Sequence, residues 1–119
     1  MNSEQLAQRC AHLALDKKAL DLRLLRVAGL SSLTDYLVLA TGNSDRQVQA
    51  IAENIRMGLK EQHDITPLAI EGMNEGRWVL LDYGDAMVHV FQPQIRSFYD
   101  LEGLWAEAAE CPVTDEPSA

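Results

Sequence analysis

The feature of this sequence that most restricts its fold is an unbroken apolar run, Tyr36–Ala40. A run of this length without polar interruption is typical of a central strand that is covered on both faces. The run ends in Thr41-Gly42-Asn43, after which Ser44 and Gln47 have the spacing of a helix capping box. A buried strand that leads directly into an amphipathic helix indicates a layered α/β domain.

The rest of the chain divides into elements at its apolar periodicity and its turn residues. The predicted elements are a helix over residues 4–17, a strand over Leu20–Val27, a helix from Ser44 to His63-Asp64, a short strand over Leu68–Ile70, a hairpin of Trp78–Tyr83 and Ala86–Phe91 around Gly84-Asp85, and helical segments after Pro93 and after Asp100.

The order of these elements predicts one α/β domain. Strands joined by short turns are antiparallel, whereas the long central helix allows a crossover, so the sheet is mixed. We expect a single domain over residues 1–106, with about five strands and flanking helices. From Glu107 onward small residues, prolines and acids dominate, and we therefore predict a disordered acidic tail over residues 107–119.

The charge of the chain argues against nucleic acid as a partner. The formal net charge is −8 and the isoelectric point is about 4.7. Nucleic-acid binding depends mainly on cation–phosphate contacts, so a domain this acidic is repelled by a phosphate backbone. The charge suits a basic protein partner, although negative charge that only maintains solubility is the commoner explanation.

Hydropathy and cysteine usage favour a cytoplasmic protein. No apolar run approaches the roughly 20 residues of a membrane span, and residues 1–5 lack the basic cluster of a signal peptide. Cys10 and Cys111 lie far apart in the sequence without the spacing of metal ligands. We therefore expect two free thiols in a reducing compartment and no contact with a membrane.

The predicted hairpin carries two different faces. One face is aliphatic and is expected to be core: Val79, Leu81, Tyr83, Ala86, Val88 and Val90. The other face mixes aromatic, apolar and polar side chains: Trp78, Leu80, Asp82, Met87, His89 and Phe91. Trp and Met are enriched at the centres of interfaces. The pattern alone leaves two alternatives open for this mixed face, a partner interface and a second face covered by helices.

A turn around Gly84-Asp85 also fixes the partners within the hairpin. Trp78 then lies opposite Phe91, Leu80 opposite His89, and Asp82 opposite Met87, which leaves Asp82 and His89 as diagonal neighbours able to form an ion pair. Downstream, Tyr99-Asp100-Leu101-Glu102 combines an aromatic ring with two acids. This combination suits a basic protein surface, and a helix junction capped by Asp100 is the commoner alternative.

An enzymatic function is not favoured by the residues. The turn Gly42-Asn43-Ser44 is of a kind that binds phosphate at a helix start and is found in nucleotidyltransferases. Those enzymes need a cluster of carboxylates for two metal ions, whereas Asp45 is the only acid before Glu53. The dispersed histidines, His12, His63 and His89, have no ligand at metal-binding spacing. We predict no enzyme activity, no metal and no cofactor.

Four sequence blocks occur in order and together resemble the ribosomal silencing factor (Iojap/RsfS) family: Ser31–Gln47, Glu71-Gly72, Trp78–Phe91 and Arg96–Trp105. The resemblance spans about residues 4–105. It implies a nucleotidyltransferase-like α/β fold without catalytic activity, and a homodimer. It also implies binding to the large ribosomal subunit through large-subunit ribosomal protein fourteen. Such binding obstructs joining of the small subunit and lowers translation when nutrients are scarce; a large-subunit assembly factor would use the same surface.

The resemblance also implies which residues face the ribosome. Trp78, Asp82, His89, Tyr99 and Asp100 match motif positions of the family. The full set of expected partner-binding residues is Trp78, Leu80, Asp82, Met87, His89, Tyr99, Asp100 and Glu102. The sequence departs from the family at Gly103, where a long basic residue is usual, and the acidic tail lies outside the resemblance.

Overall fold

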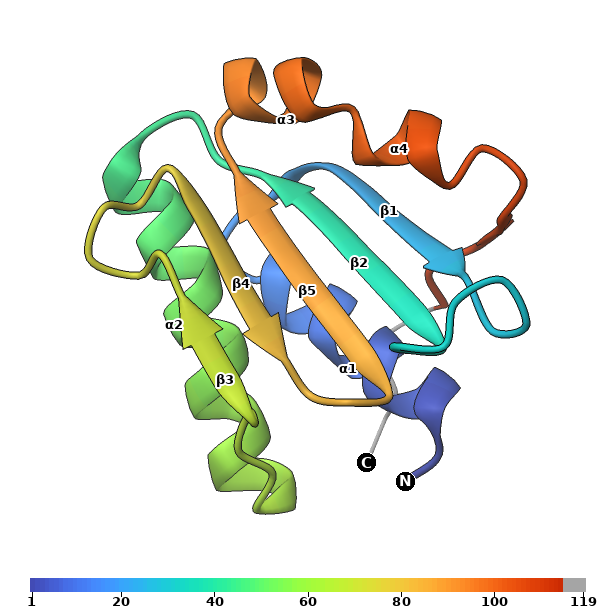
Figure 1. The fold of residues 1–119 in the computed structure, drawn as a ribbon. Helices are drawn as coiled ribbons and strands as arrows, with labels where there is room; N and C mark the ends of the chain where they lie inside the picture. The colour runs from blue at the N-terminus through green and yellow to red at the C-terminus, as the bar shows by residue number, and fades with distance from the viewer. Residues whose placement is uncertain (115–119) are drawn as a thin grey trace.

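The structure of the chain is a computed structural model that describes residues 1–114. Its elements are α1 (Ser3–Leu15), β1 (Leu20–Arg26), β2 (Tyr36–Thr41), α2 (Asp45–His63), β3 (Ala69–Glu71), β4 (Trp78–Asp82), β5 (Ala86–Phe91), α3 (Pro93–Tyr99), α4 (Leu101–Leu104) and β6 (Ala109–Cys111). The strands form one sheet of six, in the order β3-β4-β5-β2-β1-β6 (Figure 1). The predicted α/β class and mixed sheet are confirmed.

The centre of the sheet is the apolar strand β2. It pairs in parallel with β5 and antiparallel with β1, and all six of its residues are buried. The pairs β3–β4, β4–β5 and β1–β6 are antiparallel. The prediction that Tyr36–Ala40 forms a strand covered on both faces is therefore confirmed.

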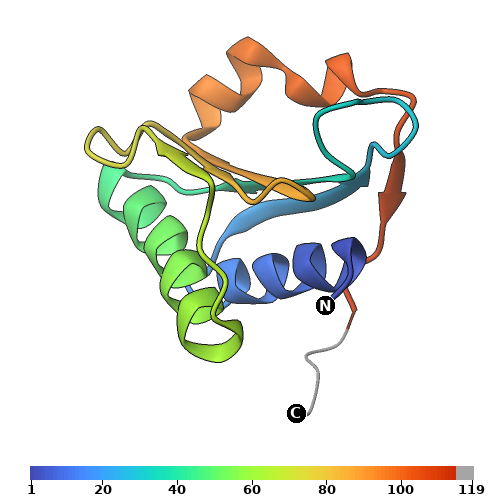
Figure 2. The same ribbon diagram turned by 60° about the horizontal axis from the view of Figure 1, so that its bottom comes forward.

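The two faces of the sheet have different cover. Figure 2 shows α1 and α2 beneath one face and α3 and α4 above the other. The α1/α2 side holds the larger hydrophobic cluster, which includes Ile51, Ile55, Leu81 and Val88. The α3/α4 side holds a smaller one, centred on Leu25, Leu37, Leu39 and Phe91. The helical cover is therefore asymmetric.

Helix boundaries follow local sequence chemistry. Asn2 and Gln5 form the capping box that starts α1. The Ser44 hydroxyl accepts a hydrogen bond from the Gln47 amide at the start of α2, while the Gln47 side chain accepts one from the amide of Asn43. Asp64, in the left-handed conformation with φ 54°, ends that helix.

Gly58 allows α1 and α2 to pack closely. A Cβ atom at this position would overlap the Leu13 side chain of α1, which is itself buried. Glycine inside a helix costs about 1 kcal/mol relative to alanine. Gly58 therefore lowers the intrinsic stability of α2 but permits a close contact between the two helices.

The number of strands and the end of the chain differ from the prediction. The sheet has six strands because Ala109–Cys111, which we expected to be disordered, pairs with β1 as β6. The following segment is held by Gln8 on α1, whose side chain donates to the carbonyl of Pro112 and accepts from the amide of Thr114. The rest of the predicted tail, residues 115–119, lies outside the described residues.

Within residues 1–114, none of the helices is long and apolar enough to cross a membrane.

Candidate functional site

The β4–β5 hairpin separates its side chains as the sequence predicted. Trp78 pairs with Phe91, Leu80 with His89, and Asp82 with Met87. The alternate residues form the aliphatic face, which is buried against α1 and α2: Val79, Leu81, Tyr83, Ala86, Val88 and Val90. This half of the hairpin is core, which confirms its assignment.

The mixed face is covered only in part. Phe91 is fully buried in the smaller cluster, beneath Ile95, Leu101 and Trp105 of the α3/α4 side. The other five residues of this face each keep partial exposure to solvent: Trp78, Leu80, Asp82, Met87 and His89. The two alternatives that the sequence left open therefore both apply, since one end of the face is core and the rest is accessible.

An aromatic cluster lies where the cover ends. The Trp78 ring lies 4.8 Å from the Tyr99 ring and 5.8 Å from both the His89 and the Phe91 rings, measured between centroids. Phe98 packs edge-on against Tyr99 at 5.0 Å. Tyr99 is 54% exposed and Phe98 is 80% exposed. The end of α3 thus extends the hairpin face with two accessible rings.

Phe98 is absent from the predicted set of partner-binding residues. Its helical spacing with Ile95 and Leu101 is typical of a core position, and those two residues do pack inward. Phe98 instead lies on the exposed side of α3, which ends one residue later at Tyr99, before the left-handed Asp100 redirects the chain. Leu104, which is 71% exposed, departs from its apolar periodicity in the same way. The apolar spacing in the sequence does not separate these two exposed residues from the core.

His89 serves as a hydrogen-bond acceptor on this face. The indole Nε1 of Trp78 donates to His89 Nδ1 at 3.0 Å, which requires that this nitrogen carry no proton. Burial lowers the pKa of His89 to about 4, so the ring is neutral at pH 7. Asp82 instead accepts a hydrogen bond from the Gly84 amide at 2.8 Å and stabilises the hairpin turn. The pairing is thus Trp78–His89 rather than the ion pair considered from the sequence.

The two acids after Tyr99 both have partners within the molecule. Asp100 accepts a hydrogen bond from the Gly103 amide at 3.1 Å and caps α4, as the sequence allowed. A Cβ atom at Gly103 would overlap the Asp100 carboxylate, so glycine at this position accommodates the cap. The Glu102 carboxylate is bonded to Arg96 and Arg23, and Arg96 holds the pKa of Glu102 below its usual range.

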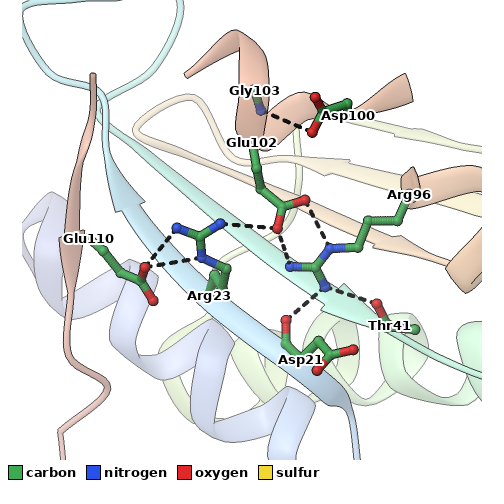
Figure 3. Close-up of polar contacts among 8 residues, drawn as sticks. All are labelled: Asp21, Arg23, Thr41, Arg96, Asp100, Glu102, Gly103 and Glu110. Carbon is green, nitrogen blue, oxygen red and sulfur yellow. Dashed lines mark hydrogen bonds and ion pairs between the residues drawn. The ribbon is translucent and has the colours of Figure 1, made fainter. Parts of the chain in front are cut away.

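Figure 3 shows the polar network around Glu102. Arg96, which is 8% exposed, donates through Nε and Nη2 to the two oxygens of Glu102 at 3.1 and 3.0 Å. Its Nη1 donates to the Asp21 carbonyl at 2.7 Å and to the Thr41 hydroxyl at 2.8 Å. Arg23 joins Glu102 to Glu110 on β6. The network therefore connects β1, β2, α3, α4 and β6.

Two regions relevant to nucleotide binding have polar groups that are already bonded within the chain. At the turn Gly42-Asn43-Ser44, the amides of Asn43 and Gln47 are bonded to side chains of the same segment. An open polar depression is lined by Asp21, Leu22, Arg23, Arg96 and Glu102, and its two guanidinium groups are paired with carboxylates. In the part of the chain that the structure describes, no group of three or more His, Cys, Asp or Glu side chains is placed to hold a metal ion.

Comparison with known proteins gives the family of this chain. The family described as "Ribosomal silencing factor during starvation" matches residues 1–119. Ribosomal silencing factor RsfS of Bacillus subtilis is 43% identical over 108 residues, which are 91% of each chain. The chain belongs to the ribosomal silencing factor family. The sequence resemblance is thereby confirmed.

Other members of the ribosomal silencing factor family share both sequence and fold. The chloroplastic protein Iojap of Zea mays is 36% identical over 99 residues, which are 82% of this chain and 42% of that longer protein. A crystal structure from Chromobacterium violaceum superposes with a TM-score of 0.86 at 35% identity and covers 99% of this chain and 92% of that one. A Bacillus halodurans crystal structure superposes with a TM-score of 0.80 at 38% identity and covers 92% of this chain and 98% of that one. The ribosomal silencing factor fold therefore extends over the whole described domain.

Proposed function

We propose that this chain represses translation by binding the large ribosomal subunit through large-subunit ribosomal protein fourteen, in the cytoplasm, and sterically blocking the small subunit. Membership of the ribosomal silencing factor family supports a ribosome-associated role. The observation that carries the proposal for the surface is the accessible Trp78–Tyr99 pair, which lies where the helical cover of the sheet ends.

The chemistry of this surface suits a protein partner. Large aromatic side chains that are partly buried before binding lose little conformational entropy on docking, and a tryptophan anchor contributes about 2 kcal/mol or more. Leu80 lies next to Trp78 on the same face, and Met87 lies further along it, opposite Asp82. Together with Tyr99 and Phe98 they provide the apolar centre that an interface of about 800 Å² per partner needs.

The border of this apolar centre is acidic. Glu71 on the edge strand β3 lies opposite Leu80 and is exposed, so its carboxylate is on the same face as Asp82. Asp85 lies exposed in the hairpin turn. The net charge of −8 has the same sign as this border. Complementary charge directs a basic ribosomal protein to this face and accelerates the encounter.

The mechanism requires occupancy of a surface and no bond-making chemistry. A domain of this size seated on the large subunit excludes the small subunit by its bulk alone, so we propose that the chain is not an enzyme. A homodimer, which the family resemblance implies, is a further proposal, and analytical ultracentrifugation tests it directly.

Co-sedimentation with purified ribosomal subunits tests the proposed function. The natural chain is expected to travel with the large subunit and to prevent formation of whole ribosomes. Trp78→Glu and Leu80→Glu are expected to stay at the top of the gradient, because each places a charge in the apolar centre. Leu80→Glu is expected to keep the fold, since neither hydrophobic cluster among residues 1–114 includes Leu80. It therefore separates loss of binding from loss of folding.

A matched control is Met57→Glu. Met57 is an exposed apolar residue on α2, in the layer beneath the opposite face. This variant should bind as the natural chain does. Failure of the natural chain to bind the large subunit would refute the proposed function. Full binding by folded Leu80→Glu and Trp78→Glu would refute the surface.

A further inference from the structure

Residues 97–101 form a corner between α3 and α4 whose two ends are joined by one ion pair. Arg96 lies immediately before the corner and Glu102 immediately after it, and two parallel hydrogen bonds connect them. Two-pronged pairing between a guanidinium and a carboxylate fixes both distance and orientation. The ion pair therefore sets the path of the five residues between its partners.

The same ion pair is anchored to the sheet. Arg96 donates to Thr41 at the end of β2 and to the backbone carbonyl of Asp21. Asp21 lies at an irregularity of the β1–β2 register and has φ 48°, in the left-handed region. This unusual backbone conformation gives Arg96 its carbonyl acceptor. The corner is thus held against two strands of the sheet.

A chain of ring contacts links the ion pair to the proposed docking surface. The Arg96 guanidinium lies 5.5 Å from the centre of the Phe91 ring. Phe91 contacts Trp78, and Trp78 contacts Tyr99 within the corner. A displacement of the corner therefore separates the two rings of the Trp78–Tyr99 pair.

The two acids at the corner bond to other groups of this chain. Glu102 is occupied by Arg96 and Arg23, and Asp100 caps α4. The most exposed large side chains of the corner are Phe98 and Tyr99. The corner therefore presents rings to a partner, while its acids maintain its shape.

We propose that Arg96 and Glu102 are positioning residues for ribosome binding, which act by holding Tyr99 against Trp78 and make no contact with the partner themselves. This inference rests on the proposed function. A preordered corner avoids the entropy cost of ordering Tyr99 on binding, a saving that corresponds to about three- to tenfold in affinity for one such side chain.

A double-mutant cycle for binding to purified large subunits tests the inference, with affinities measured at a temperature where circular dichroism shows every variant folded. Glu102→Gln is expected to weaken binding about three- to tenfold. Tyr99→Ala is expected to weaken it more. Because Glu102 acts through Tyr99, the double variant should bind no more weakly than Tyr99→Ala alone.

Two further variants separate positioning from other effects. Arg96→Lys keeps the charge but loses the two-pronged geometry, so it should repeat the loss seen in Glu102→Gln. Glu110→Gln removes a partner of Arg23 that lies outside the corner, and its affinity should equal that of the natural chain. Hydrogen exchange should accelerate at the amides of Asp100 and Gly103 in Glu102→Gln and stay unchanged in Glu110→Gln.

The possible results lead to different conclusions. Non-additive losses with faster exchange at the corner support the inference. Losses of Glu102→Gln and Tyr99→Ala that add in full overturn it, because they indicate that Glu102 contacts the partner directly, while the proposed function stands. Unchanged affinity in both Glu102→Gln and Arg96→Lys also overturns it. Absence of binding by the natural chain overturns the proposed function and this inference together.

Discussion

The two faces of the β4–β5 hairpin share one strand pair and one alternation of side chains, yet they differ in what covers them. The face with Leu81 and Val88 lies under α1 and α2 and is entirely buried. The face with Trp78 and Leu80 is fully buried only at Phe91, on the α3/α4 side, and its other residues stay partly exposed. The difference teaches that large apolar residues at a strand position become core or stay accessible to solvent according to the extent of the helices above them.

Neighbouring leucines provide the sharpest test of this contrast. Leu81→Ala is expected to lower the free energy of unfolding by about 3 kcal/mol, because it leaves a cavity in the larger cluster. Leu80 is the preceding residue and lies on the partly exposed face with Trp78 (the open face). Leu80→Ala should lower the free energy of unfolding by about 1 kcal/mol or less. Urea denaturation of both variants measures the two values, and similar losses would contradict the assignment of the faces.

The covered face also depends on the close approach of its two helices. Gly58→Val is expected to destabilise the protein by about 2 kcal/mol, because the added side chain overlaps the buried Leu13 of α1. Ala50→Val is the matched control, since Ala50 is exposed on the same helix. Its loss should be limited to the helix propensity of valine, about 0.5 kcal/mol. Equal losses in thermal unfolding would show that the α1–α2 contact tolerates a side chain at position 58.

The open face is expected to make stability depend on pH. The pKa of His89 is about 4 in the folded chain and 6.5 for an unperturbed histidine. Between these values the unfolded chain binds a proton that the folded chain does not, so stability falls as the pH drops from 6.5 toward 4. The expected loss is about 2 kcal/mol after allowance for the partial exposure of the ring.

A variant isolates this contribution from that of other groups. His89→Gln keeps an acceptor for Trp78 Nε1 and does not titrate. The difference in unfolding free energy between the natural chain and His89→Gln should therefore change by about 2 kcal/mol between pH 7 and pH 4. A constant difference across this range would show that the pKa of His89 is not lowered in the folded chain.

The smallest effect is expected at the far edge of the open face. Glu110→Gln removes an exposed ion pair between β6 and β1. Pairs of this kind contribute at most about 1 kcal/mol, so urea denaturation should detect only a slight loss. A larger loss would indicate that β6 does more to hold the sheet together than its three residues suggest.

Local sequence patterns predicted most of the hairpin site. The alternation of Trp78–Phe91 and the turn around Gly84-Asp85 predict the register and both faces correctly, because hairpin register depends on neighbouring residues. The Asp100 cap was also readable from the sequence. The ring contact between Trp78 and Tyr99 was not, since it depends on where α3 meets the sheet.

Features that depend on distant residues could not be predicted in this way. β6 consists of only three residues, Ala-Glu-Cys, which is too short for an alternation to identify a strand, and it is a strand because the edge of β1 is available to pair with it. The internal partners of Glu102 include Arg23, which lies 79 residues away in the sequence. No spacing rule connects such residues, so Glu102 looked like an acid available to a partner.

The polar network of Arg96, Glu102 and Glu110 has a consequence for the order in which the protein is made. These three residues follow β5, the last of the central strands, whereas their partners Arg23 and Thr41 precede it. A growing chain folds from its N-terminus as it emerges, so β1 to β5 can pair before the α3/α4 corner exists. Under the proposed function, a growing chain therefore completes its docking surface only after the corner has emerged.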